Sequence, residues 1–155
     1  MIWIPISLFH AFLALALLFA LHLLGAFLWV GGVTAAAMVS RRRRGADDPP
    51  SPSWDILERD FLLKLGLPGM VLVLLTGVGL LSSSPEYFLR QGWLHAKLAL
   101  VALLAALTLV AAIRRGSSRR GPVRRGSAPA RIDLLEGLFF FGVCAVLLLA
   151  VLKPF

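Results

Sequence analysis

The first 40 residues contain no aspartate, glutamate, lysine or arginine, and four consecutive arginines, Arg41–Arg44, follow them. An uncharged apolar stretch of this length is typical of a membrane-spanning helix, because a helix satisfies its own backbone hydrogen bonds inside lipid. The whole chain has 155 residues, of which 59% are hydrophobic. A soluble domain of this size could not bury so many apolar side chains.

Four apolar runs follow one another along the chain. Each is long enough to cross a membrane, which takes roughly 20 residues, and none alternates with the period of a strand. We therefore predict an all-α integral membrane protein, a four-transmembrane-helix bundle with a long first helix, as a single domain over residues 1–155. The predicted helices cover residues 6–40, 53–82, 92–114 and 132–153, and the loops 41–52 and 115–131 carry most of the charge.

The first predicted helix is longer than a membrane is thick. About 35 residues extend roughly 52 Å, whereas the hydrocarbon core measures about 30 Å. We expect this helix to tilt, break or protrude, with an N-terminal extension beyond the bundle. Its basic residues follow the apolar run, which indicates an uncleaved anchor rather than a secretory signal. In the second predicted helix, we expect a kink at Pro68.

The net charge of +8 comes mainly from two blocks, Arg41–Arg44 and Arg114–Arg131, which hold eleven of the sixteen basic residues. Arginines that flank membrane spans mark the cytoplasmic side. We therefore expect both arginine-rich loops to be cytoplasmic and both termini to lie outside. The blocks also attract anionic lipid head groups, so membrane lipid is an expected partner. We expect no nucleic acid, because the charge does not form a folded basic face.

Three ionisable side chains lie at a similar predicted depth in the membrane. Counting from the charged end of each helix places His22, Lys97 and His95 about 27, 25 and 28 Å from the cytoplasmic face. An ionisable group in hydrocarbon needs a partner and often marks a functional site. We expect His22 and Lys97 to form a polar site between the first and third helices. The competing interpretations are a helix–helix hydrogen bond for His22, snorkelling of Lys97, and an interfacial position for His95.

His22 shares one helical face with Gly25, Trp29 and Gly32, which fall within about 80° of one another. Imidazole is a common axial ligand of haem iron. Glycines allow a second helix to approach closely, and they would equally allow a planar macrocycle. Other chemistry has little support, because the chain has one cysteine and no intramembrane acidic cluster for zinc or calcium. It also has no motif of a hydrolase or an NTPase.

Four segments carry a resemblance to a known family. They are "LHLLGAFLWVGG" with His22, Trp29 and Gly32; "LERDFLLKLGLPGMVLVLLTGVGLL" with Glu58, Arg59, Pro68, Met70 and Gly77; "GWLHAKLALVALL" with Trp93, His95 and Lys97; and "LLEGLFFFGVCAVLLLAVLKPF" with Glu136 and the ending Lys153, Pro154 and Phe155. In this order they resemble the HemJ-type protoporphyrinogen oxidases, related more distantly to copper-resistance protein D-like membrane proteins. The resemblance covers residues 18–155, and the chain is a divergent member by this comparison.

The resemblance implies a function and a site. Such proteins oxidise protoporphyrinogen IX to protoporphyrin IX in haem biosynthesis and bind haem b. It implies that His22 is the metal ligand and a catalytic residue. It also implies that Lys97 holds a propionate or takes part in proton transfer, and that Trp29, Gly25, Gly32 and His95 contribute to cofactor binding. The implied partners are a tetrapyrrole substrate and quinone or the respiratory chain as electron acceptor, in a bacterial inner membrane. A homo-oligomer or a larger membrane complex is compatible with the sequence.

The chain departs from the family pattern at several positions. Phe19 stands where members usually carry a lysine, three residues before the histidine, and Thr34 is the only polar group between Gly32 and Ser40. These departures leave a second interpretation, a non-catalytic accessory subunit of a larger membrane complex, with or without haem. A third interpretation is copper handling, which the shortage of methionine, cysteine and histidine disfavours.

Overall fold

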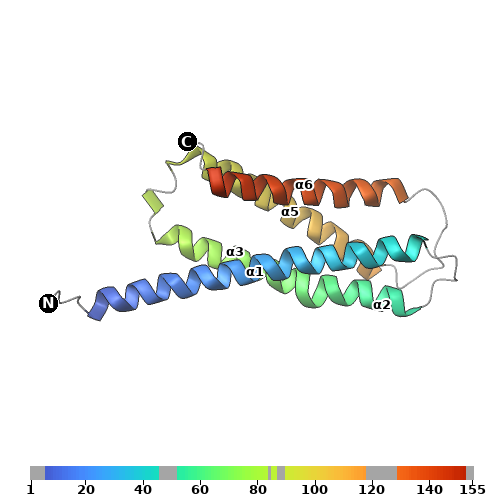
Figure 1. Ribbon diagram of the computed structural model, residues 1–155, viewed down its shortest axis with the longest axis horizontal. Coiled ribbons are helices and arrows are strands. Elements are labelled where there is room, and N and C mark those ends of the chain that lie inside the picture. Colours follow the sequence, from blue (N-terminus) through green and yellow to red (C-terminus); the bar gives the residue numbers. More distant parts are fainter. Residues whose placement is uncertain (1–5, 46–51, 84, 87–89, 118–128, 153–155) are drawn as a thin grey trace.

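The computed structural model describes residues 6–45, 52–83, 85–86, 90–117 and 129–152, and this part of the chain is helical without a strand (Figure 1). Four long rods form a bundle. The elements are α1 (Ile6–Gly45), the continuous rod α2 (Pro52–Asp60), η1 (Phe61–Gly66) and α3 (Leu67–Ser82), then α5 (Gly92–Ser117) and α6 (Pro129–Leu152). Residues 9–43, 53–82 and 92–114 are long and apolar enough to cross a membrane, and α6 holds a shorter apolar stretch, 137–148. The chain is therefore an all-α membrane protein with a four-helix bundle.

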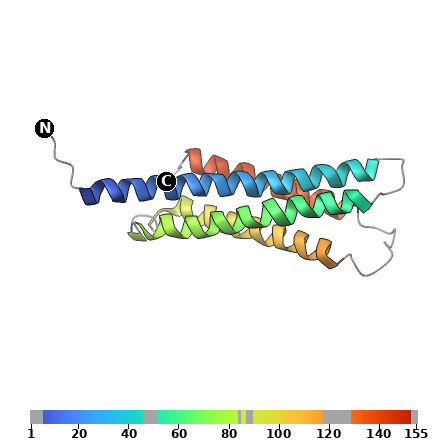
Figure 2. The same cartoon turned by 90° about the horizontal axis from the view of Figure 1, so that it is seen from below.

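The first helix is unbroken. It has 40 residues, which corresponds to roughly 60 Å of helix. Figures 1 and 2 show its N-terminal end extending past the ends of the other helices. Of the outcomes expected for an overlong helix, breaking is therefore excluded and protrusion is observed.

The rod next to α1 contains a π-helical turn, η1, immediately before Pro68. The backbone N–H of Leu67 donates to the carbonyl oxygen of Leu62, five residues earlier. Because Pro68 has no N–H, the carbonyl of Lys64 would lack its α-helical donor. The departure from α geometry thus lies one turn before the proline where we expected a kink.

The helices α1 and α3 approach each other backbone to backbone. A Cβ atom added to Gly32 would lie 2.4 Å from the backbone nitrogen of Gly66, and one added to Gly25 would lie 2.9 Å from that of Val73. On the facing helix, a Cβ on Gly69 would lie 2.4 Å from the nitrogen of Trp29. Only glycine permits this spacing, so these positions fix how the two helices cross.

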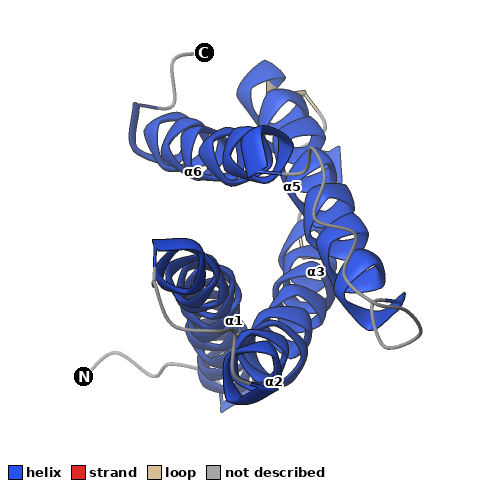
Figure 3. Cartoon of the chain, turned by 90° about the vertical axis from the view of Figure 1, so that its right-hand side faces the viewer, coloured by secondary structure: helices blue, strands red, loops and turns tan. Residues whose placement is uncertain are grey.

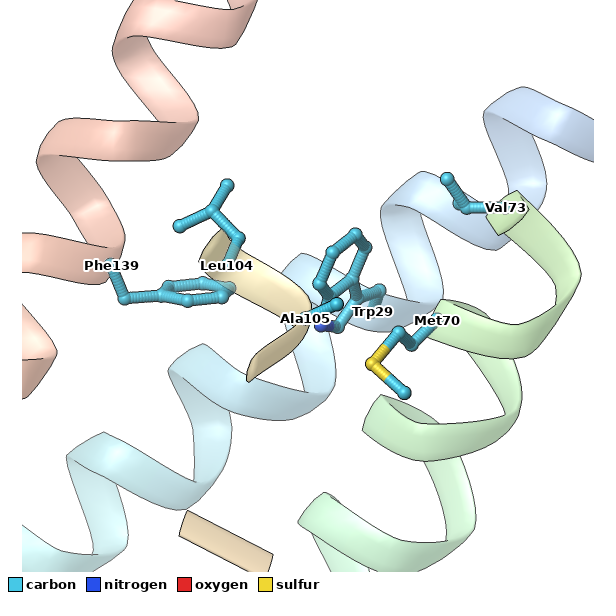
Figure 4. Close-up of a cluster of buried hydrophobic side chains, with 6 residues drawn as sticks. All are labelled: Trp29, Met70, Val73, Leu104, Ala105 and Phe139. Atoms are coloured by element: carbon cyan, nitrogen blue, oxygen red, sulfur yellow. The ribbon is translucent and has the colours of Figure 1, made fainter. Parts of the chain in front are cut away.

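The bundle consists of two helix pairs joined by a belt of apolar side chains. Figure 3 shows α1 beside α2 and α3, and α6 beside α5. The belt contains Trp29 of α1, Met70 and Val73 of α3, Leu104 and Ala105 of α5, and Phe139 of α6 (Figure 4). The indole of Trp29 contacts the ring of Phe139 edge to face, with 6.3 Å between ring centres. One large aromatic side chain therefore connects α1 to the opposite helix pair.

Candidate functional site at the histidine end

His22 lies on α1 and turns toward α3. Its ring nitrogen Nδ1 is 3.0 Å from the hydroxyl oxygen of Thr76. The ring is partly buried, and a Cβ on Gly77 would lie 3.3 Å from its Cε1 atom. The ring therefore lies against a bare stretch of the α3 backbone. We call the region formed by His22, Thr76, Gly77 and Lys97 the histidine end.

The hydrogen bonds of Thr76 determine which ring nitrogen of His22 carries the proton. The Thr76 hydroxyl donates its single hydrogen to the carbonyl oxygen of Leu72, at 2.6 Å. Its oxygen can then only accept from His22, so Nδ1 is the protonated nitrogen. The other nitrogen, Nε2, keeps its lone pair. This tautomer, with one N–H anchored to the protein, is the form in which histidines usually bind metal ions.

Lys97 lies on α5, and its charged side chain is near His22. Its side chain is partly buried and has no hydrogen-bond or ion-pair partner among the described residues. The pairing of His22 and Lys97 in one polar site remains a prediction. His95, half a turn away, is exposed, and its Nδ1 lies 3.1 Å from the carbonyl oxygen of Gln91 on its own helix.

Trp29, Gly25 and Gly32 have structural contacts on the same face of α1. Trp29 is 4% exposed, and its indole N–H donates to the hydroxyl of Thr108 on α5 at 3.0 Å. Gly25 and Gly32 are both buried against the backbone of the neighbouring rod. The space that a macrocycle would need beside the two glycines is therefore taken by that rod. Of the two explanations open for the glycines, helix packing is the one that the structure provides.

The described residues contain no group of three or more histidine, cysteine or acidic side chains that could hold a metal ion. A haem iron differs from such a site, since four of its ligands come from the porphyrin and a single histidine can anchor it. The chemistry available here is a fixed imidazole with a free nitrogen beside an uncompensated ammonium group.

Two residues of this region were not predicted from the sequence. Thr76 and Thr108 each accept a hydrogen bond from an α1 side chain, His22 and Trp29 respectively, and each donates to its own helix. Threonine is common in apolar helices, so neither stands out in the sequence. The signal that could find them is a polar residue at the same depth as a histidine or tryptophan that needs a partner.

Comparison with known proteins gives relatives of one kind. The chain is 35% identical to a protoporphyrinogen IX oxidase of Synechocystis over 92 residues, which are 55% of this chain and 43% of that protein. It is 32% identical to a protoporphyrinogen IX oxidase of Helicobacter pylori over 100 residues, 64% of this chain and 66% of that protein. In the protein of that name from a second Helicobacter pylori strain, 49 residues match at 47% identity and cover 33% of its length.

The matched segments thus span less than two thirds of each of these relatives. No family model and no solved structure matches the chain. The three relatives nevertheless share one name, and the resemblance derived from the four segments points to the same proteins. In sequence, the chain is similar to part of these protoporphyrinogen IX oxidases.

Proposed function

We propose that this protein is a haem-b-binding membrane oxidoreductase that converts protoporphyrinogen IX to protoporphyrin IX. The names of its relatives support the reaction. The single observation that carries the haem assignment is the 3.0 Å contact between His22 Nδ1 and the Thr76 hydroxyl, since Nε2 has no hydrogen-bond partner among the described residues. The same contact is also the helix–helix hydrogen bond named above as the competing interpretation of His22, so the test below must separate the two.

The side chains at the histidine end fit a haem. His22 would bind the iron through Nε2, while the Thr76 hydroxyl keeps the imidazole ring from rotating. Lys97, which lacks a partner among the described residues, would pair with a propionate. When bound, the haem would supply a one-electron redox centre. Because Gly25 and Gly32 already pack against the neighbouring rod, we assign the contact with haem to His22 and Lys97.

The reaction removes six electrons and six protons from the tetrapyrrole. Three quinone molecules would accept them and leave as three quinols, which balances the reaction. A membrane site suits this substrate, since the ring system is flat and apolar while its two carboxylates require a cation. For Lys97 we propose pairing with a propionate or a part in proton transfer. We further propose a bacterial inner membrane, with the arginine-rich loops cytoplasmic.

A second candidate is a haem-binding subunit without catalytic activity. Phe19, at a position where the related family usually has a lysine, is 55% exposed and lies one turn from His22. The N-terminal part of α1 also carries exposed aromatic side chains, including Phe9 and Phe12. Such a surface would suit contact with another membrane protein, if lipid does not cover it.

Complementation distinguishes the two candidates. The gene would be expressed in a bacterial strain that lacks protoporphyrinogen oxidase, with the His22→Ala variant as the control. We expect growth without added haem for the wild type and none for the variant. Membranes that contain the protein with bound haem but do not restore growth would contradict the oxidase and favour the subunit.

A further inference from the structure

A second unpaired cation lies at the opposite end of the bundle. We call this region, with Arg43, Asp55, Glu58 and Arg59, the arginine end. The Nε atom of Arg59 is buried and has no hydrogen-bond partner. No ion pair joins the Arg59 guanidinium to another described residue either. A guanidinium that is partly withdrawn from water without an anion is costly, so its environment points to a missing acidic group.

The neighbouring acidic side chains are engaged elsewhere. Arg43 of α1 forms an ion pair with Asp55 and lies 3.8 Å from Glu58, whose side chain is 7% exposed. Asp60 pairs with Lys64 at 2.6 Å. The protein therefore supplies partners for Arg43 and Lys64, and its nearby carboxylates leave Arg59 uncompensated.

Arg59 also differs from Arg41 and Arg42 in its exposure, since it is partly buried. Arg41 and Arg42 are exposed, as expected for side chains that reach lipid phosphates at the membrane surface. Arg59 lies one helical turn further along the rod than Asp55, and one turn before Leu62. Leu62 is 1% exposed and packs with Ala36 of α1 and Ala112 of α5. An anion held by Arg59 would therefore lie between helices rather than in the lipid head-group layer.

We propose that Arg59 binds a carboxylate of the tetrapyrrole at the arginine end, at a position separate from the histidine end. This inference rests on the proposed function for the identity of the ligand. Thr76, which contacts His22, lies 17 residues from Arg59 along the same rod, or roughly 25 Å. The two carboxylates of the tetrapyrrole are on one edge of the ring, so a single molecule cannot place one on Lys97 and the other on Arg59. The planar guanidinium fork suits a carboxylate, which it can bind with two parallel hydrogen bonds.

The test measures binding of a stable porphyrin instead of turnover. Haem-loaded protein in phosphatidylcholine nanodiscs is titrated with mesoporphyrin IX or with its dimethyl ester, which lacks both charges, and porphyrin fluorescence anisotropy reports binding. We expect Arg59→Gln to weaken binding of the diacid by about tenfold or more and to leave binding of the ester unchanged. Arg42→Gln, an exposed arginine two residues from Ser40, is the matched control and should behave as the wild type. Arg59→Lys, which keeps the charge but not the fork, should lie in between and covers the case in which the glutamine variant does not fold.

Three results would overturn the proposal. One is equal binding of the diacid by the wild type and by both Arg59 variants. Another is an equal loss of diacid and ester binding in both Arg59 variants at unchanged haem content, because Arg59 would then not recognise the carboxylates. The third is loss of diacid binding to the wild type when phosphatidylglycerol replaces part of the phosphatidylcholine, because Arg59 would then bind lipid phosphate. Haem content, read from the spectrum of the same samples, tests the proposed function separately. Unchanged haem with unchanged diacid affinity would therefore contradict the Arg59 site alone.

Discussion

The two ends of the bundle differ in how their charged side chains are compensated. At the arginine end, Arg43 is paired with Asp55 and lies near Glu58, and Lys64 is paired with Asp60. At the histidine end, no carboxylate contacts either His22 or Lys97 among the described residues, and the partners of His22 are the hydroxyl of Thr76 and the backbone of Val73, which are both neutral. Ion pairs thus neutralise most of one end, while the other end retains a positive group and a free ring nitrogen.

This difference suggests a criterion that separates polar groups with a structural role from polar groups available to a ligand. A group that the protein has already compensated contributes to folding or orientation. A group held in a fixed geometry without compensation is ready for a partner from outside the chain. By this criterion we propose His22 and Lys97 for the functional site and assign Arg43 a structural role, while Arg59 is an exception at the arginine end.

The largest expected effect is a loss of stability when the close contact between α1 and the neighbouring rod at Gly32 is disturbed. Gly32→Ala would place a methyl group 2.4 Å from the nitrogen of Gly66 and force α1 away from the rod. We expect a destabilisation of about 2–3 kcal/mol, since backbone cannot yield as a side chain can. Thermal unfolding in detergent, followed by circular dichroism, measures it. Gly31→Ala is the control because nothing lies within 4 Å of its added Cβ; equal melting temperatures for the two variants would refute the close approach.

A smaller effect is expected at the histidine end, where the change affects binding more than folding. Thr76→Val removes the acceptor for the Nδ1 proton of His22 and frees the ring to rotate. We expect haem affinity to fall by about 10- to 100-fold, as is usual when the partner of a metal-binding histidine is lost. Haem titration of the purified apoprotein provides the affinity. Thr76→Ser keeps the hydroxyl and should bind as the wild type does; a valine variant with unchanged affinity would contradict the proposed role of Thr76.

The belt between the two ends offers a third comparison. Trp29→Phe and Thr108→Val each remove one partner of the 3.0 Å hydrogen bond, while the double variant removes both. Because the bond is buried, each single change should cost about 1 kcal/mol or more, and the double variant less than their sum. Strict additivity in a thermal double-mutant cycle would show that the two side chains are not coupled.

The smallest effect is expected for the ion pair at the arginine end. Asp55→Asn removes a carboxylate that is 61% exposed, so the pair with Arg43 is strongly screened by solvent. We expect a loss of less than about 1 kcal/mol, which disappears at high salt. A loss as large as that for Gly32→Ala would mean that this end depends on its ion pairs more than exposure suggests.

Much of the fold could be predicted from the sequence because lipid imposes simple rules. Uncharged runs bounded by arginines gave the four helices, and the length of the first run indicated its protrusion. The π-helical turn before Pro68 could not be predicted, since it depends on how Phe61–Gly66 pack against α1. The contact between Gly32 and Gly66 could not be predicted either. Counting residues gives the depth of each residue in the membrane, but it does not say which helix faces contact each other.

The ionisable residues of the candidate site could be proposed from the sequence, whereas the threonine and the roles of the glycines could not. His22 and Lys97 stand out in the sequence because ionisable side chains are rare in apolar helices, and helix rise predicts one level for both. Their role in a common site stays a prediction. Thr76 carries no comparable signal, yet it decides the tautomer of His22. Gly25 and Gly32 show what a shared helical face cannot predict. Packing against a helix and packing against a macrocycle require the same small residues, so the sequence does not distinguish the two.

The measurement that tests the central claim most directly is a dithionite-reduced minus oxidised absorption spectrum of protein purified from haem-replete cells. Wild type, His22→Ala and His95→Ala are compared at equal protein concentration. If His22 binds the iron, the wild type and the His95 variant show the α-band of haem b and the His22 variant lacks it. A colourless wild type, or a His22 variant with an unchanged α-band, would contradict the account.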